Sequence, residues 1–396
     1  MIWARPLSRA DSAAALWIRS GLTPEGVGLV RSGLESHALV TGLTQDTREL
    51  LAELVGVAWA GGAGDAAIIR YSRLCVENWF GRLGLSELGV ALSRLLLSEH
   101  PPAMTRLGTH KLTWGQRTRV MGIINVTPDS FSDGGAHFDP ERAVAHGLAL
   151  LDEGADVLDI GGESTRPGAA PVSEGEEMRR VLPVIEGLRL KRPEVLISVD
   201  TRKASVARAA VKAGAQLIND VSGLRDEAML EVVASTGVCA CAMHMLGTPE
   251  TMQAGPRYDD VGAEILDALE MALRRAEGRG VARDRLWVDP GIGFGKSAEH
   301  NLFLLRRAGD LRLLGAPVLI GVSRKAFLGT ILGGKPPAER VDASAAIAAA
   351  LAAEGVVDVV RVHDVTQTRD ALAVGDAIRL ARDGSALRHL IQAART

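Results

Sequence analysis

The feature that most constrains the fold is a regular alternation of short apolar segments and longer amphipathic segments from residue 120 onward. The short segments have the length and flanking residues of buried strands, and the longer ones have helical spacing. The predicted strands are residues 120–124, 157–160, 196–199, 217–218, 238–243, 286–288, 318–322 and 359–360. The predicted helices are residues 140–153, 173–191, 203–213, 227–235, 259–278, 298–308, 338–354 and 366–383. Eight strands that each precede a helix predict an α/β protein with a TIM (β/α)8 barrel, which typically takes about 250 residues.

Polar residues follow these predicted strands at their carboxyl ends. Asn125 follows the first strand, Asp200 the third and Asp289 the sixth. In a barrel all loops after the strands lie at one face, which accounts for the pattern. An open, doubly wound sheet is the alternative, but it needs a glycine-rich phosphate turn after its first strand and a switch point. Neither is visible in the sequence, so we expect a barrel with a site at its mouth.

The length indicates more than one domain. At 396 residues the chain exceeds what one hydrophobic core usually holds. We place the barrel at residues 109–396 and a small α+β domain at residues 1–108, where the alternation is missing. Helical patterns at residues 11–20, 45–55 and 86–98 and strand-like segments at residues 38–40 and 67–69 support this mixture. The role of the first domain stays open between a partner enzyme, a regulatory domain and an assembly surface.

Composition narrows the class of partner. A net charge of −3 and a pI near 6.3 give no overall attraction to nucleic acid or to an anionic membrane. No segment approaches the roughly 18 apolar residues of a membrane span, and charges interrupt the first residues. We therefore expect a cytoplasmic protein that binds small molecules. The cysteines, Cys75, Cys239 and Cys241, lack companions at zinc spacing and are expected to be core residues.

Three polar groups predict a planar ring as ligand. Asp200, Asn219 and Asp289 fall at the ends of the third, fourth and sixth strands, inside the expected mouth. A heterocycle with an amidine-like edge offers two parallel donors to a carboxylate, and a donor and an acceptor to an amide. The alternative is that these groups bond neighbouring backbone, which is less favoured when three strand ends carry them.

A second set of residues suits an anion. Thr165 and Arg166 follow the second strand, and Arg361 and His363 follow the eighth on one strand face. Arginine suits phosphate oxygens, and the set fits a diphosphate better than a single phosphate. Asn125 offers an oxygen that helps to hold a hydrated Mg2+ whose other ligands are phosphate oxygens.

The end of the seventh strand carries a lysine. Strand alternation places Ser323 and Lys325 on one side and Arg324 on the other, so Arg324 is expected to pair elsewhere. For Lys325 a Schiff base remains conceivable, whereas hydrogen bonding or cation stacking needs less tuning of its pKa.

From about residue 111 onward these motifs resemble the dihydropteroate synthase family. The matching motifs are NVTPDSFSDGG at Asn125, GGESTRPG at Gly161, SVDT at Ser198, IND at Ile218, MHM at Met243, DPGIGFGK at Asp289, SRK at Ser323 and RVHDV at Arg361. The resemblance implies a TIM barrel that condenses 6-hydroxymethyl-7,8-dihydropterin diphosphate with 4-aminobenzoate and releases pyrophosphate. It also implies a homodimer formed through barrel helices.

The resemblance further implies a role for each matching residue. Those expected to hold the pterin are Asp200, Asn219, Asp289 and Lys325, with Met243 packing against the ring. Those expected to hold the diphosphate and Mg2+ are Asn125, Arg361 and His363, joined by Arg166. Those expected around 4-aminobenzoate are Phe131, Thr165, Pro167, Phe294, Ser323 and Lys325. The expected catalytic residues are Lys325, Arg361, His363 and Asp200.

Two other functions fit parts of the pattern. A corrinoid-linked methyltransferase also uses a pterin-binding barrel, but it has no use for a diphosphate clamp. A catalytically idle pterin-binding paralogue is expected to lose some of the proposed diphosphate and pterin contacts. Asn125, Lys325, Arg361 and His363 are all present, so the sequence favours the synthase.

Overall fold

The structure is a computed structural model of the chain. It describes residues 3–6, 37–41, 57–59, 67–70, 104–127, 139–164, 171–249 and 251–381, the first four ranges as backbone strands only. Two compact units are distinguished, one within residues 1–100 and one that spans residues 101–312 and 316–396.

The first unit contains a four-stranded antiparallel sheet. Its strands are β1 (Trp3–Pro6), β2 (His37–Thr41), β3 (Val57–Trp59) and β4 (Ala67–Arg70), in the order β1-β2-β4-β3. The strands predicted at residues 38–40 and 67–69 are confirmed as parts of β2 and β4. The three predicted helices lie outside the described residues.

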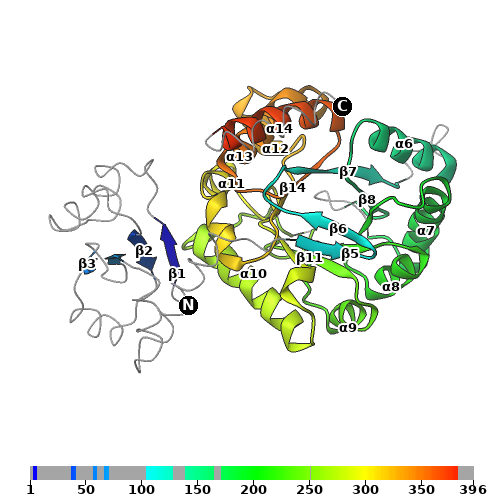
Figure 1. Ribbon diagram of the computed structural model, residues 1–396, viewed down its shortest axis with the longest axis horizontal. Coiled ribbons are helices and arrows are strands. Elements are labelled where there is room, and N and C mark those ends of the chain that lie inside the picture. Colours follow the sequence, from blue (N-terminus) through cyan, green and yellow to red (C-terminus); the bar gives the residue numbers. More distant parts are fainter. Residues whose placement is uncertain are drawn as a thin grey trace. The chain divides into compact units, whose positions relative to one another are not determined.

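The second unit is a closed barrel of eight parallel strands (Figure 1). The strands are β7 (Arg119–Asn125), β8 (Val157–Gly161), β9 (Ile197–Asp200), β10 (Leu217–Asp220), β11 (Cys239–Met243), β12 (Leu286–Asp289), β13 (Leu319–Ile320) and β14 (Val359–Val362). They pair in the order β12-β11-β10-β9-β8-β7-β14-β13, and a parallel bridge between Val288 and Val318 closes the circle. The predicted TIM barrel is therefore confirmed.

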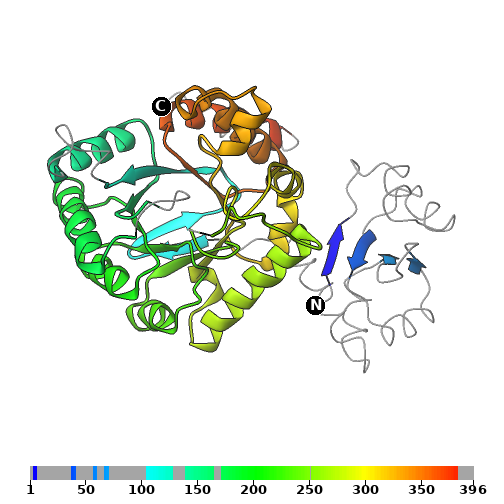
Figure 2. The ribbon, with the colours of Figure 1, turned by 180° about the vertical axis from the view of Figure 1, so that it is seen from behind.

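Helices surround the barrel on the outside (Figure 2). They are α6 (Pro140–Asp152), α7 (Glu174–Lys191), α8 (Ala204–Ala213), α9 (Glu227–Thr236), α10 (Val261–Gly278), α11 (Ala298–Arg306), α12 (Ala326–Ile331), α13 (Val341–Glu354) and α14 (Val365–Leu380). Side chains cap several of them: Asp139 accepts from the first turn of α6, and Asp260 accepts from Gly262 and Ala263 of α10. These two helices thus begin where the sequence supplies a capping oxygen.

The region after β13 differs from the sequence prediction. A six-residue helix, α12, stands between β13 and the helix predicted at residues 338–354. That later helix begins at Val341, after a short 3-10 turn at Pro337–Glu339. Six residues are too few for a helical period to be recognised, which explains why α12 was not predicted.

A hairpin covers the end of the barrel opposite the strand tips. Its paired strands are β5 (Met104–Leu107) and β6 (His110–Thr113). The turn falls at Gly108, whose φ of +59° favours glycine. Trp114 follows the hairpin, donates to Thr105 Oγ1 and meets the Trp287 ring edge-on, with ring centroids 5.4 Å apart. The domain boundary expected at residue 108 falls in this turn.

The barrel core includes two of the cysteines. Cys239 and Cys241 are buried together with Met121, Leu217 and Trp287 at the covered end. Burial raises the pKa of Cys239 to about 12, so the thiol stays protonated. Their predicted place in the core is confirmed, while Cys75 lies outside the described residues. Within the described parts of the chain, no helix is both long and apolar enough to cross a membrane.

Candidate active site

A pocket opens at the carboxyl ends of the barrel strands. Its lining residues are Asp200, Asn219, Val221, Met243, Asp289, Ile292, Phe294, Gly321, Lys325 and Arg361. The structure therefore brings together the residues that the sequence assigned to the polar ring, from the ends of β9 to β14. Val221, Ile292 and Gly321 were not predicted, and they give the pocket its apolar walls.

One guanidinium bridges two carboxylates in this pocket. Arg361 on β14 donates from Nε to Asp159 Oδ2 at 2.5 Å and from Nη2 to Asp200 Oδ2 at 2.7 Å. Asp159 lies on β8 and is fully buried, so its charge requires a buried cation. No described residue bonds the remaining nitrogen, Nη1, of Arg361. The predicted phosphate ligand thus also holds the carboxylates of the pocket in place.

An amide oxygen and a carboxylate oxygen remain free for a ligand. Asn219 donates from Nδ2 to Asp159 Oδ2 at 3.1 Å, and no described residue forms a hydrogen bond with its buried Oδ1. Asp289 Oδ1 accepts the Gly291 N–H at 2.7 Å, which leaves Oδ2 available. An unpaired buried acceptor costs about 1–3 kcal/mol, so the pocket favours a ligand that supplies N–H donors.

Burial shifts the ionisation of both pocket aspartates. It raises the pKa of Asp289 to about 6, although the Gly291 N–H and the Lys325 charge act in the opposite direction. It also raises the pKa of Asp200 to about 7, against the charge of Arg361 and with the help of the Asp159 charge. The carboxylates therefore titrate within reach of neutral pH, as expected of a functional site.

Lys325 lies over an aromatic ring at the edge of the pocket. Its Nζ is 4.2 Å from the centre of the Phe294 ring. Burial, and next the Arg361 charge, lower the pKa of Lys325 to about 8. At neutral pH the lysine therefore keeps a proton while it is poorly solvated, which suits a hydrogen-bond donor to a ligand.

The ends of three strands meet around His363. Its Nδ1 lies 2.9 Å from Ser323 Oγ, and its Nε2 lies 3.5 Å from Asn125 Nδ2. Burial and the Arg361 charge lower the pKa of His363 to about 4, so the imidazole is neutral at pH 7. Ser323, His363 and Asn125 thus form a continuous polar row beside the pocket.

Arg324 points away from this row, as the sequence predicted. Its Nε donates to Asp364 Oδ2 at 2.9 Å, and its backbone N–H donates to Ser344 Oγ at 3.0 Å. Arg324 has a φ of +57°, an uncommon conformation for a residue with a side chain. The ion pair holds the backbone of the SRK turn in the conformation that directs its two neighbours to the pocket.

A buried lysine joins the loops after β11 and β12. Lys296 Nζ lies 3.0 Å from His244 Nδ1 and donates to the carbonyl of Phe294 at 2.9 Å. The two loops are in close backbone contact, because a side chain on Gly291 would lie 1.9 Å from the carbonyl oxygen of His244. Gly291 also has a φ of +69°. Lys296 therefore fixes the loop segments that carry Met243 and Phe294.

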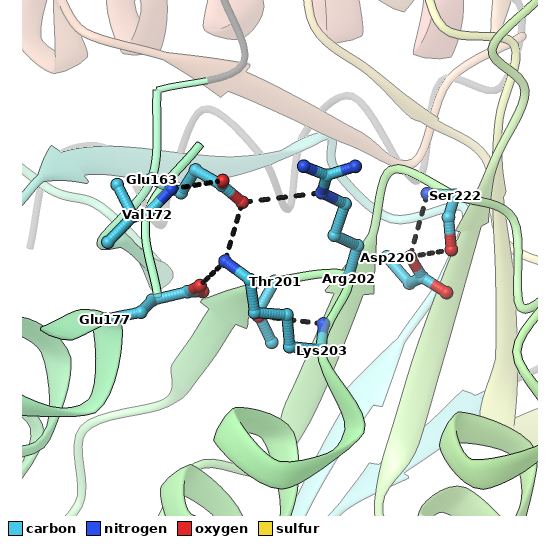
Figure 3. Close-up of polar contacts among 8 residues, drawn as sticks. All are labelled: Glu163, Val172, Glu177, Thr201, Arg202, Lys203, Asp220 and Ser222. Carbon is cyan, nitrogen blue, oxygen red and sulfur yellow. Dashed lines mark hydrogen bonds and ion pairs between the residues drawn. The ribbon is translucent and has the colours of Figure 1, made fainter. Parts of the chain in front are cut away.

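A second lysine joins the segments after β8 and β9 (Figure 3). Lys203 Nζ donates to Glu163 Oε2 at 2.9 Å and to Glu177 Oε2 at 2.5 Å. Glu163 Oε1 accepts the backbone N–H of Val172 at 3.0 Å, and Arg202 donates to its other oxygen. Glu163 therefore ties together the two ends of the connection between β8 and α7.

Some predicted site residues lie outside the described residues. These are Phe131, Thr165, Arg166 and Pro167. Among the residues that are described, no group of three or more His, Cys, Asp and Glu side chains is arranged to hold a metal ion.

The comparisons with known proteins agree with this geometry. The family model described as "Pterin binding enzyme" matches residues 121–363. Dihydropteroate synthase of Escherichia coli (strain K12) is 47% identical over 264 residues, which cover 67% of this chain and 93% of that protein. The chain belongs to the dihydropteroate synthase family.

Solved structures place this synthase barrel among its relatives. The structure of Xanthomonas albilineans dihydropteroate synthase with 4-aminobenzoic acid matches with a TM-score of 0.65 and 49% identity, over 70% of this chain and 98% of that one. A probable bifunctional folylpolyglutamate synthase/dihydropteroate synthase of Halobacterium salinarum is 42% identical over 390 residues. That match covers 94% of this chain and 46% of the other, so it includes most of residues 1–108.

Sequence reasoning missed several charged residues of the synthase site. Asp159, Glu177 and Lys203 bond other side chains inside the protein, and Lys296 bonds two loops. Asp159 offered a signal, because a carboxylate in an otherwise apolar strand needs a partner. The lysines offered none, because their side-chain partners lie 26 or more residues away.

We expect Lys203→Met to destabilise the synthase by about 3–5 kcal/mol, because the fully buried Glu177 loses its cation. The free energy of unfolding in urea measures this loss. Arg369→Met, which breaks an exposed pair with Asp370, serves as the control and should cost less than about 1 kcal/mol. Equal losses in the two variants would contradict the role given to Lys203.

Proposed function

We propose that the barrel catalyses the reaction of its family, in which 6-hydroxymethyl-7,8-dihydropterin diphosphate and 4-aminobenzoate form 7,8-dihydropteroate and pyrophosphate. The observation that supports the proposal most directly is the pair of acceptors in the pocket. Asn219 Oδ1 and Asp289 Oδ2 are available to accept hydrogen bonds from a ligand, and Lys325 lines the same pocket. A ring with an amidine-like edge supplies such donors.

In this proposal the pterin ring lies in the mouth of the barrel. Its N–H groups face Asp289 and Asn219, and Lys325 donates to an acceptor on the ring. Met243 and Phe294 pack against the ring from the loops that Lys296 joins. Asp200 contributes through its contact with Arg361, since both line the same pocket.

The bond that breaks joins the methylene carbon to the diphosphate oxygen. Positive charge then develops on the carbon and spreads into the ring, where the Asp289 carboxylate stabilises it. No described residue forms a hydrogen bond with Arg361 Nη1, so this nitrogen donates to the leaving diphosphate. His363 is neutral, so it acts there as a hydrogen-bonding group without a charge of its own. The amine of 4-aminobenzoate forms the new C–N bond and releases a proton.

Mg2+ is the cofactor in this proposal, and Asn125 is its ligand from the chain. The Asn125 amide nitrogen faces His363, so the amide oxygen is directed elsewhere and suits a hard cation. The other ligands in this proposal are diphosphate oxygens and water. When bound, the ion neutralises charge on the departing diphosphate.

The binding of 4-aminobenzoate draws on residues from both sides of the pocket. Among the described residues, Phe294 offers an aromatic face, and Ser323 and Lys325 offer donors. Phe131, Thr165 and Pro167 complete this subsite in the proposal, on the basis of the family motifs, and Arg166 joins the diphosphate contacts.

Pyrophosphate release from the dihydropterin diphosphate, with and without 4-aminobenzoate, tests the reaction. We expect release that needs 4-aminobenzoate and Mg2+ and that falls by about 100-fold or more in Lys325→Ala, because a donor to the reacting ring is lost. Asn125→Ala should raise the Mg2+ concentration needed for half-maximal rate. Lys212→Ala, on the exposed face of α8, is the control and should leave the rate unchanged. No release from folded wild type would contradict the proposal.

The pH dependence of kcat/KM should be bell-shaped. The acid limb is expected near pH 6, because Asp289, with a pKa raised to about 6, must be ionised to accept from the ring. The alkaline limb is expected near pH 8, because Lys325, with a pKa lowered to about 8, must keep its proton. Lys325→Arg should move the alkaline limb upward, since a guanidinium stays charged. An alkaline limb at the same pH in that variant would assign it to another group.

We also propose that the chain forms a homodimer through barrel helices. In this proposal residues 1–108 form a separate small domain. The support is an apolar surface on α12 and α14, where Ile331, Val374 and Ile378 are more than half exposed. Val374 and Ile378 lie one turn apart on one helix face. The two helices lie on the same side of the barrel (Figures 1 and 2).

The mass in solution tests this assembly. We expect twice the chain mass of 41.8 kDa for wild type and the chain mass for Val374→Glu/Ile378→Glu, because buried carboxylates oppose association. A piece that starts at residue 101 should keep the double mass, if the helices carry the dimer. A monomeric piece would instead assign assembly to the first domain.

A further inference from the structure

A second cavity lies behind the pterin pocket, between the end of β11 and helix α10. Its volume is about 140 Å3. Met243, Leu269 and Ala272 form its apolar side, and Arg225, His244 and Arg275 form its polar side. None of the predicted roles uses this cavity, and Met243 is the residue that it shares with the pterin pocket.

The two arginines of this cavity have no acidic partner among the described residues. Arg275 Nη2 donates to the Gly223 carbonyl at 3.2 Å, while its Nε is buried and has no hydrogen-bond partner. Arg225 Nη2 donates to the Met245 carbonyl at 2.7 Å. Elsewhere on α10, Arg274 pairs with Glu270 at 2.8 Å. The backbone contacts therefore hold two guanidiniums in place without neutralising them, which is the condition for anion binding.

The neighbouring histidine adds a neutral donor. Burial and the charges of Lys296 and Arg225 lower the pKa of His244 to about 3. Because Lys296 Nζ lies 3.0 Å from Nδ1 and donates to it, that nitrogen accepts, and Nε2 carries the proton. The polar side of the cavity thus offers donors and no described carboxylate.

The apolar side limits the size of the ligand. A cavity of about 150 Å3 lined by apolar side chains holds one benzene ring, and this cavity is of similar volume. A single ring therefore fits against Leu269 and Ala272, with its anionic group toward the arginines. Met271 stands at the edge and is 51% exposed, so the cavity is open to solvent.

We propose that this cavity is a second binding site, which takes a single-ring aryl carboxylate with its carboxylate on Arg275 and Arg225. The second site adjoins the pterin pocket at Met243, which lines both cavities. The occupant is either the cosubstrate 4-aminobenzoate or another benzoate. Titrations with benzoate and with 4-aminobenzoate distinguish these two sources.

The test follows the methionine methyl groups of the full chain by NMR while benzoate is added. We expect the Met271 resonance, assigned with Met271→Leu, to move and to saturate. In Arg275→Met the dissociation constant should rise on the order of tenfold or more, because a charge-assisted hydrogen bond is lost. Arg279→Met, at the same end of α10 but paired with Glu227, is the matched control and should bind as wild type does.

A second variant and a second ligand test the proposal independently of Arg275→Met. Arg225→Met, which alters an exposed side chain, should also weaken binding even if Arg275→Met proves unstable. Repeating the titration with 4-aminobenzoate should give tighter binding only if the cosubstrate is the natural occupant. An unmoved Met271 resonance, or equal affinity in wild type and both arginine variants, would overturn the proposal. Failure of the synthase reaction would appear as absent pyrophosphate release and would leave the Met271 titration unaffected.

Discussion

The charge of Arg361 holds the mouth of the barrel together. Its guanidinium lies between Asp159 on β8 and Asp200 on β9, and it comes from β14 on the other side of β7. Without this cation, burial would force the carboxylates to take up protons or to move into water. With it, they stay in place at the strand ends and leave Asn219 and Asp289 free to receive a ligand. The active site is therefore organised around one buried cation before any substrate arrives.

Two lysines repeat this device in the loops. Lys203 connects the segment after β8 with the start of α8, and Lys296 connects the loops after β11 and β12. The pairing of the barrel strands does not by itself fix the conformation of the loops that follow them. Lysine side chains with several acceptors provide that specification, and each of them costs stability if one partner is removed. In this way Lys296 fixes the position of Phe294, in the loop after β12, and of Met243, at the end of β11.

Met243 lies at the boundary between two cavities. It ends β11, packs against Met245 and Phe294, and lines both the pterin pocket and the cavity beside α10. The unneutralised arginines on the far side give that second cavity a chemical preference that the pterin pocket does not share. The two neighbouring cavities therefore differ in the charged groups that line them.

The sequence by itself determined the barrel and most of its mouth. Alternating strand and helix patterns depend on local spacing, and a barrel directs the residues after every strand to one face, so Asp200, Asn219 and Asp289 were placed correctly in one pocket. The homologous motifs then named the reaction. Only the tertiary structure decided the partners of the buried charges: the contact of Arg361 with Asp159 spans 202 positions, and that of Lys296 with His244 spans 52. It also decided that Arg225 and Arg275 meet in one cavity. Such pairs are set by how helices and loops pack across the barrel, and no local period in the chain encodes them.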